Sequence, residues 1–194
     1  MTEADPRENW QVPHLLAQDY DALLDLFRSL DAPAPGEVAG EYAGIDYYGL
    51  TDETFAAALG RVKAGQGSFW LGKGMPGDEG DGASGYNRLR RPDGTVSRCD
   101  RFGVYRGPSP LDGKETLFLK YSDFDNAAGS IGFFDEIRKV NDNLFLCTGT
   151  PEEGHGTPGF FILSGPPTRF GGVDDPQSEL LTAANDGTEV GGEE

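Results

Sequence analysis

Residues 133–150 read FFDEIRKVNDNLFLCTGT, and this stretch decides the fold. Two runs rich in apolar and β-branched residues, 133–140 and 144–150, flank Asn141-Asp142-Asn143, a turn-forming triplet of hairpin length. Neither run shows a helical period of useful length. The stretch therefore predicts two antiparallel strands joined by a tight turn.

Similar short runs, separated by turn-forming residues, extend from this hairpin in both directions. They cover residues 37–48, 68–75, 86–91, 95–106, 116–122 and 159–163, which makes about eight strands in all. Sequential antiparallel strands form a sandwich or a closed up-and-down barrel, and the 29 glycines favour the barrel, because glycines in strands mark tight bends. We therefore expect a mainly β fold, an antiparallel β-barrel of about eight strands.

Two helices are expected beside the strands. Apolar residues at helical spacing predict an amphipathic helix near the N-terminus, formed by Leu16, Tyr20, Leu23, Leu24, Phe27 and Leu30. A short helix is expected within residues 51–62, after the first strand, where Thr51 or Asp52 can cap it. The expected organisation is an N-terminal arm with its helix over residues 1–31, a barrel domain over 32–170 and an acidic, disordered tail over 171–194.

The chain has 194 residues and a formal net charge of −17, and most of this charge lies at its ends. Residues 1–31 and 172–194 together carry −12, so the barrel segment is only mildly acidic. Nucleic acids and anionic membranes bind proteins through basic surfaces, which this composition does not offer. We therefore expect neither nucleic acid nor a membrane as a partner.

The sequence also indicates where the protein works and which groups it holds. It has no apolar run of membrane-spanning length and no apolar core of a secretory signal, so we expect a cytoplasmic protein. In that compartment Cys99 and Cys147 are expected as two reduced, buried thiols. His14 and His155 are scattered, without the spacing of metal or haem ligands, and we expect no metal and no cofactor.

Two short motifs point to a known family. Residues 40–44 read GEYAG, and Trp70-Leu71-Gly72-Lys73 follows about 26 residues later. This order resembles the GXWXG domain family, with Tyr42 where that family usually has tryptophan. The segments 98–102, 105–107, 121–123, 135–138 and 159–163 resemble the domain of unknown function that commonly follows it. The resemblance covers about residues 37–165 and implies a small lipocalin-like barrel, without implying a reaction.

The aromatic residues of these motifs have two interpretations. An aromatic side chain between glycines can plug the closed end of a small barrel, because the glycines let the backbone bend around the ring. Tyr42 and Trp70 would then be core residues. Alternatively, Trp70 lines a ligand cavity and Lys73 lies at its edge.

The strands carry an unusual number of charged residues on both faces. Because unpaired buried charges are costly, these residues either face solvent on the outer wall or pair in a polar interior. The second alternative predicts an internal network of Arg106, Lys120, Asp123, Asp135 and Arg138. In such a network Asp123 and Asp135 are the candidate catalytic acid and base.

Three functional hypotheses follow. The first is binding of a small, mostly apolar ligand in the barrel, with aromatic walls and with Arg106 or Lys120 to fix a polar end. Its candidate ligand-binding residues are Tyr42, Trp70, Lys73, Phe102, Arg106, Lys120, Tyr121, Phe134, Arg138 and Phe161. The second is a cavity enzyme, a cyclase, isomerase or lyase, that uses a buried aspartate. The third is a structural or partner-binding module whose barrel is filled.

Overall fold

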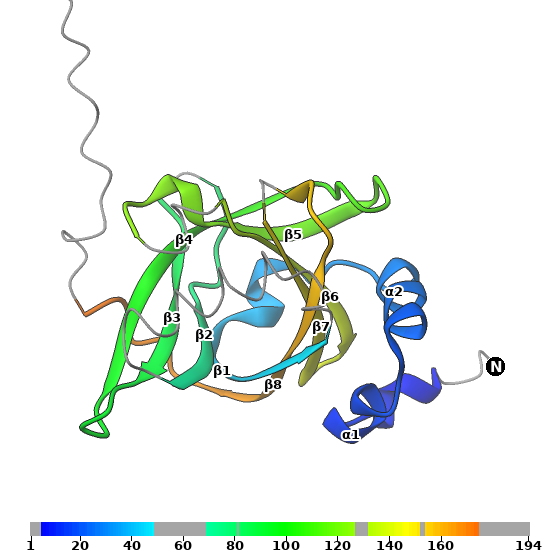
Figure 1. Ribbon diagram of the computed structural model, residues 1–194, viewed down its shortest axis with the longest axis horizontal. Coiled ribbons are helices and arrows are strands. Elements are labelled where there is room, and N and C mark those ends of the chain that lie inside the picture. The colour runs from blue at the N-terminus through cyan, green and yellow to red at the C-terminus, as the bar shows by residue number, and fades with distance from the viewer. Residues whose placement is uncertain (1–4, 49–68, 81, 127–131, 152–153, 175–194) are drawn as a thin grey trace, which may run out of the picture.

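The protein folds as a closed antiparallel barrel in a computed structural model that describes residues 5–48, 69–80, 82–126, 132–151 and 154–174. Each strand pairs with the next, and β8 pairs with β1 (Figure 1). The strands are β1 (Gly40–Tyr48), β2 (Phe69–Met75), β3 (Ser84–Arg90), β4 (Val96–Pro108), β5 (Glu115–Lys120), β6 (Phe134–Asn141), β7 (Leu144–Thr150) and β8 (Gly159–Thr168). The predicted mainly β, lipocalin-like barrel of eight strands is confirmed.

Alternation of side chains along each strand decides which residues fill the barrel. In the β6–β7 hairpin, Ile137 lies opposite Cys147, and both belong to the interior cluster. The side chains of the neighbouring pair, Arg138 and Leu146, lie on the outer surface of the barrel. The hairpin forms as its sequence predicts, with the same boundaries for β7.

The last strand, β8, is longer than the sequence indicates. It runs past residue 163 and continues through Pro166 and Pro167 to Thr168. β7 accompanies it only as far as Ser164, so both prolines lie where β8 has a partner on one side only. A proline nitrogen cannot donate a hydrogen bond, and such a one-sided position tolerates it.

Two helices, α1 (Val12–Leu16) and α2 (Tyr20–Ser29), occupy the N-terminal segment, where the spacing predicts one. The division arises because the side chain of Asp19 accepts a hydrogen bond from the Ala22 amide at 2.9 Å and so caps a new helix. Among the helices of the described residues, none combines the length and the apolarity needed to cross a membrane.

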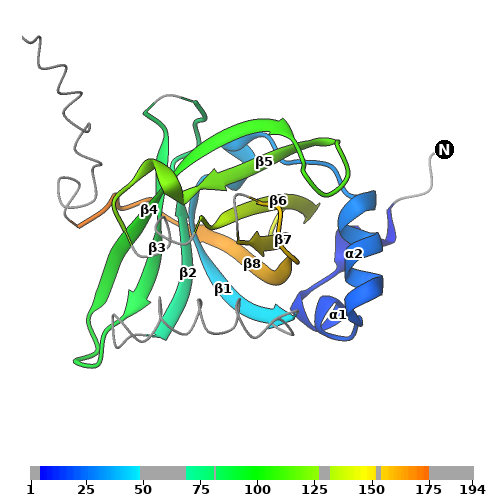
Figure 2. The ribbon, with the colours of Figure 1, turned by 45° about the horizontal axis from the view of Figure 1, so that its top comes forward.

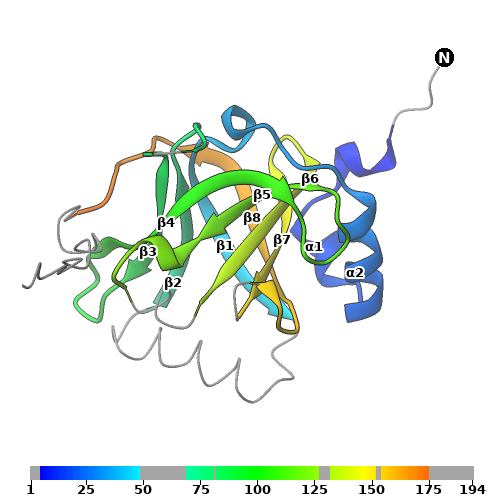
Figure 3. The same ribbon diagram turned by 90° about the horizontal axis from the view of Figure 1, so that it is seen from above.

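Both helices lie outside the barrel, beside the wall formed by β6, β7 and β8 (Figures 2 and 3). Leu23 and Phe27 of α2 are fully buried against outward-facing residues of that wall, among them Leu146, Phe160 and Ile162. The wall therefore carries a second apolar core, separate from the interior of the barrel.

One end of the barrel is closed by the chain that leaves α2, and we call it the capped end. A short 3-10 helix, Pro35–Val38, lies there, and Val38 is buried in the interior cluster. Just inside, the buried Tyr42 ring packs edge-on against Phe145, with 5.4 Å between the ring centroids. We call the other end, where β1, β3, β5 and β7 end and β2, β4, β6 and β8 begin, the loop end.

The chain that follows β8 lies against the outer wall of β3 and β4. The amides of Gly171 and Gly172 donate to the Tyr86 hydroxyl at 2.8 and 3.1 Å, and Asp174 lies 3.7 Å from Arg98. The rest of the expected tail and the short helix expected within residues 51–62 lie outside the described residues.

Arg138 fastens the N-terminal helices to the barrel. Its fully buried guanidinium donates to the Leu30 carbonyl at 2.9 Å and to Asp112 at 3.0 Å, and it lies over the Phe27 ring. A buried guanidinium stabilises a fold only when its donors are matched in this way. The residue therefore joins α2, the β4–β5 connection and β6.

Glu136 lies two residues before Arg138 on the same outer face of β6, and it is fully buried as well. Among the described residues, neither of its carboxylate oxygens has a hydrogen-bond partner of good geometry. Burial raises the pKa of Glu136, although the nearby Ser109 hydroxyl and Arg138 favour the charged form. The ionised carboxylate is therefore a destabilising group at neutral pH.

Replacing this carboxylate by an amide should stabilise the protein in a pH-dependent way. Because the pKa of Glu136 is higher in the folded than in the unfolded chain, its contribution to stability is lost as pH rises through the folded pKa. Glu136→Gln should therefore raise the free energy of unfolding by about 1 kcal/mol at about pH 7.5, and the gain should shrink towards about pH 4. Urea denaturation at both pH values measures this difference.

The exposed Glu115, 65% accessible, supplies the matched control. Glu115→Gln should change the free energy of unfolding by less than about 0.5 kcal/mol at either pH. A Glu136→Gln variant that is less stable than the parent at about pH 7.5 would show that the carboxylate is well paired.

Candidate functional site

Lys73 and Asp135 form an ion pair inside the barrel, with 2.8 Å between Nζ and Oδ2. Lys73 lies on β2 and Asp135 on β6, four strands away in a barrel of eight, so the pair joins opposite walls. Their side chains are 4% and 5% exposed. The ion pair therefore spans the lumen and is shielded from bulk solvent.

Two further polar side chains complete the arrangement. The Tyr121 hydroxyl accepts a hydrogen bond from Lys73 Nζ and donates to Asp135 Oδ2 at 3.0 Å. Asn87 Oδ1 accepts from Lys73 Nζ at 3.0 Å and from Trp70 Nε1 at 3.2 Å. We call Lys73, Asn87, Tyr121 and Asp135 the interior polar cluster.

Aromatic rings enclose the ammonium group of Lys73. The ring centroids of Phe161, Tyr121, Phe102 and Trp70 lie 5.0, 5.1, 5.2 and 5.6 Å from Nζ. These distances fall within the range of cation–π attraction, which is strongest where the cation is removed from water. The site therefore stabilises a positive charge at Nζ by a carboxylate on one side and π faces around it.

The protonation of the cluster is set mainly by burial. Burial raises the pKa of Asp135, although Lys73 and Tyr121 act in the opposite direction. Burial also raises the pKa of Tyr121 well above its ordinary value, and the charge of Asp135 adds to this rise. Tyr121 is thus a neutral hydroxyl at physiological pH, and Asp135 accepts a proton more readily than an exposed aspartate.

Two glycines of the predicted motif explain how Trp70 reaches its position. A Cβ atom on Gly44 would lie 2.3 Å from the Trp70 ring, and one on Gly72 would lie 2.1 Å from the Tyr42 carbonyl oxygen. Gly72 also has a positive φ of 127°, which other residues rarely adopt. Glycine at both positions lets β1 and β2 approach closely while the indole lies across them.

The structure gathers seven of the predicted site residues inside the barrel. Tyr42 lies near the capped end, and the others surround the ion pair: Trp70, Lys73, Phe102, Tyr121, Asp135 and Phe161. Sequence reasoning missed Asn87, because an uncharged residue on a predicted strand gave no functional signal. Its only cue was the scarcity of asparagine in strands.

The predicted internal network of five charged residues does not form. The Asp123 side chain lies on the outer surface of the barrel, where it accepts a hydrogen bond from Tyr105 at 2.7 Å and forms an ion pair with Lys120 at 3.1 Å. The alternative of an internal network is wrong at Asp123 because the chain leaves the strand at Lys120 and enters a 3-10 turn, which ends the alternation. Asp123 and Asp135 therefore cannot act together as acid and base.

The remaining predicted residues also lie outside the lumen. Phe134 stacks on Phe118 of the outer wall, with 4.8 Å between centroids, and Arg138 holds the helices as described above. Both are an odd number of positions from Asp135 along one strand, so they face the opposite side. Arg106 reaches beyond the capped end, where it pairs with Glu115.

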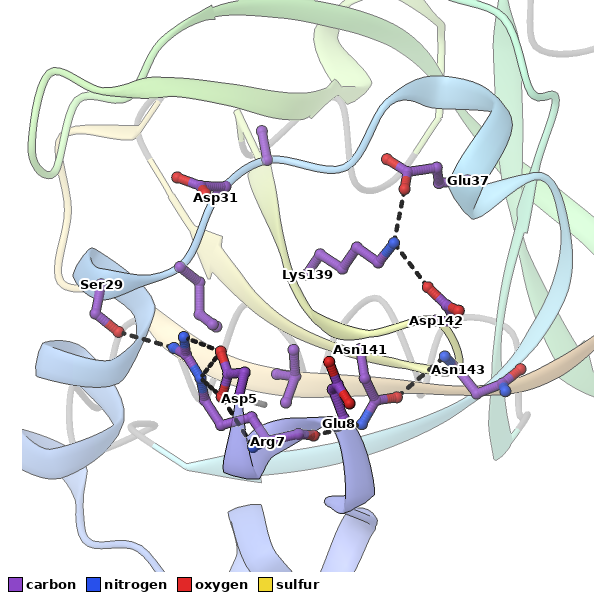
Figure 4. Close-up of a pocket in the computed structure, with 13 residues that line it drawn as sticks. Asp5, Arg7, Glu8, Ser29, Asp31, Glu37, Lys139, Asn141, Asp142 and Asn143 are labelled. Atoms are coloured by element: carbon purple, nitrogen blue, oxygen red, sulfur yellow. Dashed lines mark hydrogen bonds and ion pairs between the residues drawn. The ribbon is translucent and has the colours of Figure 1, made fainter. Parts of the chain in front are cut away.

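A second polar site lies outside the barrel at the capped end, between the N-terminal segment and the β6–β7 turn (Figure 4). This pocket has a volume of about 670 Å³. Its two cations are already paired: Lys139 with Glu37 at 2.6 Å and Asp142 at 2.8 Å, and Arg7 with Asp5. Ionic walls of this kind do not suit an apolar ligand.

The described residues also bear on metal binding and redox chemistry. Within them, no group of three or more histidine, cysteine, aspartate or glutamate side chains could hold a metal ion. Cys99 and Cys147 do not form a disulfide; Cys147 is buried as expected, whereas Cys99 is only half-buried. Burial raises the pKa of Cys147 well above its ordinary value, which leaves it an unreactive thiol.

Neither a protein-family model nor a curated protein sequence matches the chain. Among solved structures, it is similar to a crystal structure of a protein from Thermomonospora curvata. The TM-score is 0.51 at 18% sequence identity, and the match covers 76% of this chain and 87% of the other. A likeness at this identity concerns the fold alone, and the resemblance to the GXWXG family stays a prediction.

The Lys73–Asp135 ion pair should show a strong coupling between the effects of its two residues on the free energy of unfolding. Lys73→Met leaves a buried carboxylate unpaired and Asp135→Leu leaves a buried ammonium unpaired, so each should cost about 3–5 kcal/mol of unfolding free energy. The double variant removes both charges and should be less destabilised than either single variant. Chemical denaturation of the four proteins measures the coupling.

The outer-wall pair of Lys120 and Asp123 is the matched control for this cycle. Its lysine side chain is 40% exposed, so Lys120→Met should cost less than about 1 kcal/mol. Strictly additive costs at Lys73 and Asp135 would contradict a direct interaction between them.

Proposed function

We propose that this protein binds a small, mostly apolar molecule in the loop-end half of its barrel, beside the interior polar cluster. The observation that carries the proposal is the buried Lys73–Asp135 pair inside a ring of four aromatic side chains. The closed eight-stranded fold supports it, because barrels of this size have room for one small ligand.

The ion pair is not the most stable way to fill a barrel. Burying two charges carries a desolvation cost, so well-packed apolar side chains of the same volume often give a fold of equal or greater stability. The capped-end half of the interior uses such apolar packing, with Tyr42, Phe145 and Leu163. We infer that the polar half is retained for recognition, since buried groups with perturbed pKa values gather at functional sites.

The surroundings of the pair define the ligand. Aromatic side chains such as Trp70 and Phe161 offer flat apolar contacts, and Trp70 is only half-buried among the described residues. Asp135 already balances the charge of Lys73, so an ionised ligand would add an uncompensated charge to a low-dielectric site. A neutral molecule with one carbonyl or hydroxyl group fits best.

The polar anchor differs from the one that the sequence predicts. Arg106 and Lys120 lie outside the lumen, and the polar groups nearest to a ligand there are Lys73 Nζ and the Tyr121 hydroxyl. A polar ligand atom would replace one of the present partners of Nζ, such as Asn87 Oδ1. The enzyme hypothesis keeps one of its two carboxylates, Asp135, whose burial favours proton acceptance. The filled-barrel hypothesis predicts that no apolar probe enters.

We further propose that the protein works in the cytoplasm without nucleic acid or membrane partners. The two cysteines without a disulfide and the net charge of −17 support this location and these exclusions.

A neutral fluorescent probe tests the binding proposal. N-phenyl-1-naphthylamine should bind saturably, with a rise in its emission and energy transfer from Trp70, measured in a Trp10→Phe background that leaves one tryptophan. Phe161→Leu should weaken binding by about 1 kcal/mol, or roughly fivefold in Kd, because it removes an aromatic contact.

Phe134→Leu is the control, since its ring has nearly the same burial on the opposite face of the wall: 9% exposed against 7% for Phe161. This variant should leave the Kd unchanged. A probe that gives no saturable signal would support the filled-barrel hypothesis, and equal losses in both variants would place the binding site elsewhere.

A further inference from the structure

We propose that Lys73 captures a carbonyl-bearing ligand covalently, as a protonated imine formed with an apolar aldehyde or ketone. This inference rests on the proposed function and names the substrate class of the same site. Lysine amines form imines with carbonyl compounds in proteins, particularly where the lysine is desolvated.

The position of Lys73 favours this chemistry over simple recognition. Of the polar groups in the lumen, its Nζ lies where the polar contacts converge, next to Asp135, Asn87 and Tyr121. A ligand that lies along Trp70 and Phe161 would present a polar end to this nitrogen, because both rings lie within 5.6 Å of it. The carbonyl carbon would then be held beside its nucleophile.

The charge of the site is unchanged by the proposed reaction. An ammonium group and a neutral carbonyl compound give an iminium ion and one water molecule, so a single positive charge stays at Nζ throughout. Asp135 and the four aromatic rings that stabilise the ammonium ion stabilise the iminium ion in the same place. Neither oxidation nor reduction occurs, and no further reactant is required.

The neighbouring groups supply the proton transfers that the reaction needs. Asp135 takes one proton from the ammonium group, and the freed electron pair of Nζ forms the C–N bond as the C=O π bond breaks. Asp135 then returns this proton, through the Tyr121 hydroxyl, to the former carbonyl oxygen. A second proton then moves from nitrogen to the carbinolamine hydroxyl group, which leaves as water while the freed electron pair of nitrogen forms the C=N bond. The chain of contacts from Lys73 through Tyr121 to Asp135 provides this route.

Asp135 is suited to this role by its surroundings. Its carboxylate is 5% exposed, and burial favours its neutral form. Because this carboxylate lies 2.8 Å from Nζ, it is the nearest acceptor for the proton that Lys73 gives up when the imine forms. Exposed pairs such as Lys120 and Asp123 have no such advantage, because water stabilises their charges.

Reductive trapping tests the proposal on the full-length protein. Purified protein is incubated with cinnamaldehyde, hexanal or decanal and sodium cyanoborohydride, and the modified residues are mapped by peptide mass spectrometry. We expect the adduct at Lys73 to form more than about tenfold faster than adducts at the surface residues Lys114 and Lys120. Cinnamaldehyde should also give the red-shifted absorbance of a conjugated iminium ion before reduction.

Three comparisons make the result decisive. Lys73→Arg keeps the charge but cannot form an imine, so it should lose the adduct and the absorbance band. Tyr105→Phe, on the outer wall, should label like the parent. Because the lysines of the unmodified protein are compared with one another, the test stands even where Lys73→Arg does not fold.

The outcomes separate this proposal from the one it rests on. If the aldehydes displace N-phenyl-1-naphthylamine but Lys73 is modified no faster than Lys120, reversible binding stands and imine formation is overturned. If the fluorescent probe does not bind at all, the proposed function itself fails. If the probe binds but no aldehyde displaces it or labels Lys73, the substrate class is wrong.

Discussion

The interior of this protein depends on one contact, the ion pair that Lys73 and Asp135 form across the lumen from opposite walls. Two charges can be buried only where hydrogen bonds and opposite charge replace water, and Asn87 and Tyr121 supply the remaining partners. The requirement explains why polar residues of distant strands converge at one level of the barrel. The rest of the lumen is filled by apolar side chains, among them Tyr42, Phe145 and Leu163.

Closure of the barrel makes this arrangement possible. Eight strands without an edge leave a lumen that side chains of every strand can reach, and the N-terminal arm closes one end with Val38. The outer wall has its own polar feature, because Arg138 ties α2 to the barrel while Glu136 remains poorly matched beside it. The charges of β6 thus serve two separate purposes, one on each face.

Much of the fold could be predicted from the sequence, and the site only in part. Turn triplets and strand runs located all eight strands, because local propensity and alternation act over a few residues. The interpretation of Tyr42 and Trp70 as core residues agrees with their positions, whereas Lys73, expected at the edge of a cavity, is buried in the interior. The internal network was wrong at Asp123, because a 3-10 turn after β5 reverses the direction in which that side chain points.

The sequence by itself determined that the chain is a mainly β barrel, since short-range periodicity carries that information. Its composition also showed that the net charge is nearly balanced in the middle of the chain and strongly negative at both ends. The sequence also placed charged residues on both faces of β6. Only the tertiary structure decided that Asp135 meets Lys73 and that Arg138 meets Leu30 instead. The physical reason is that barrel closure sets which strands lie opposite one another, and no local pattern encodes a contact between β2 and β6.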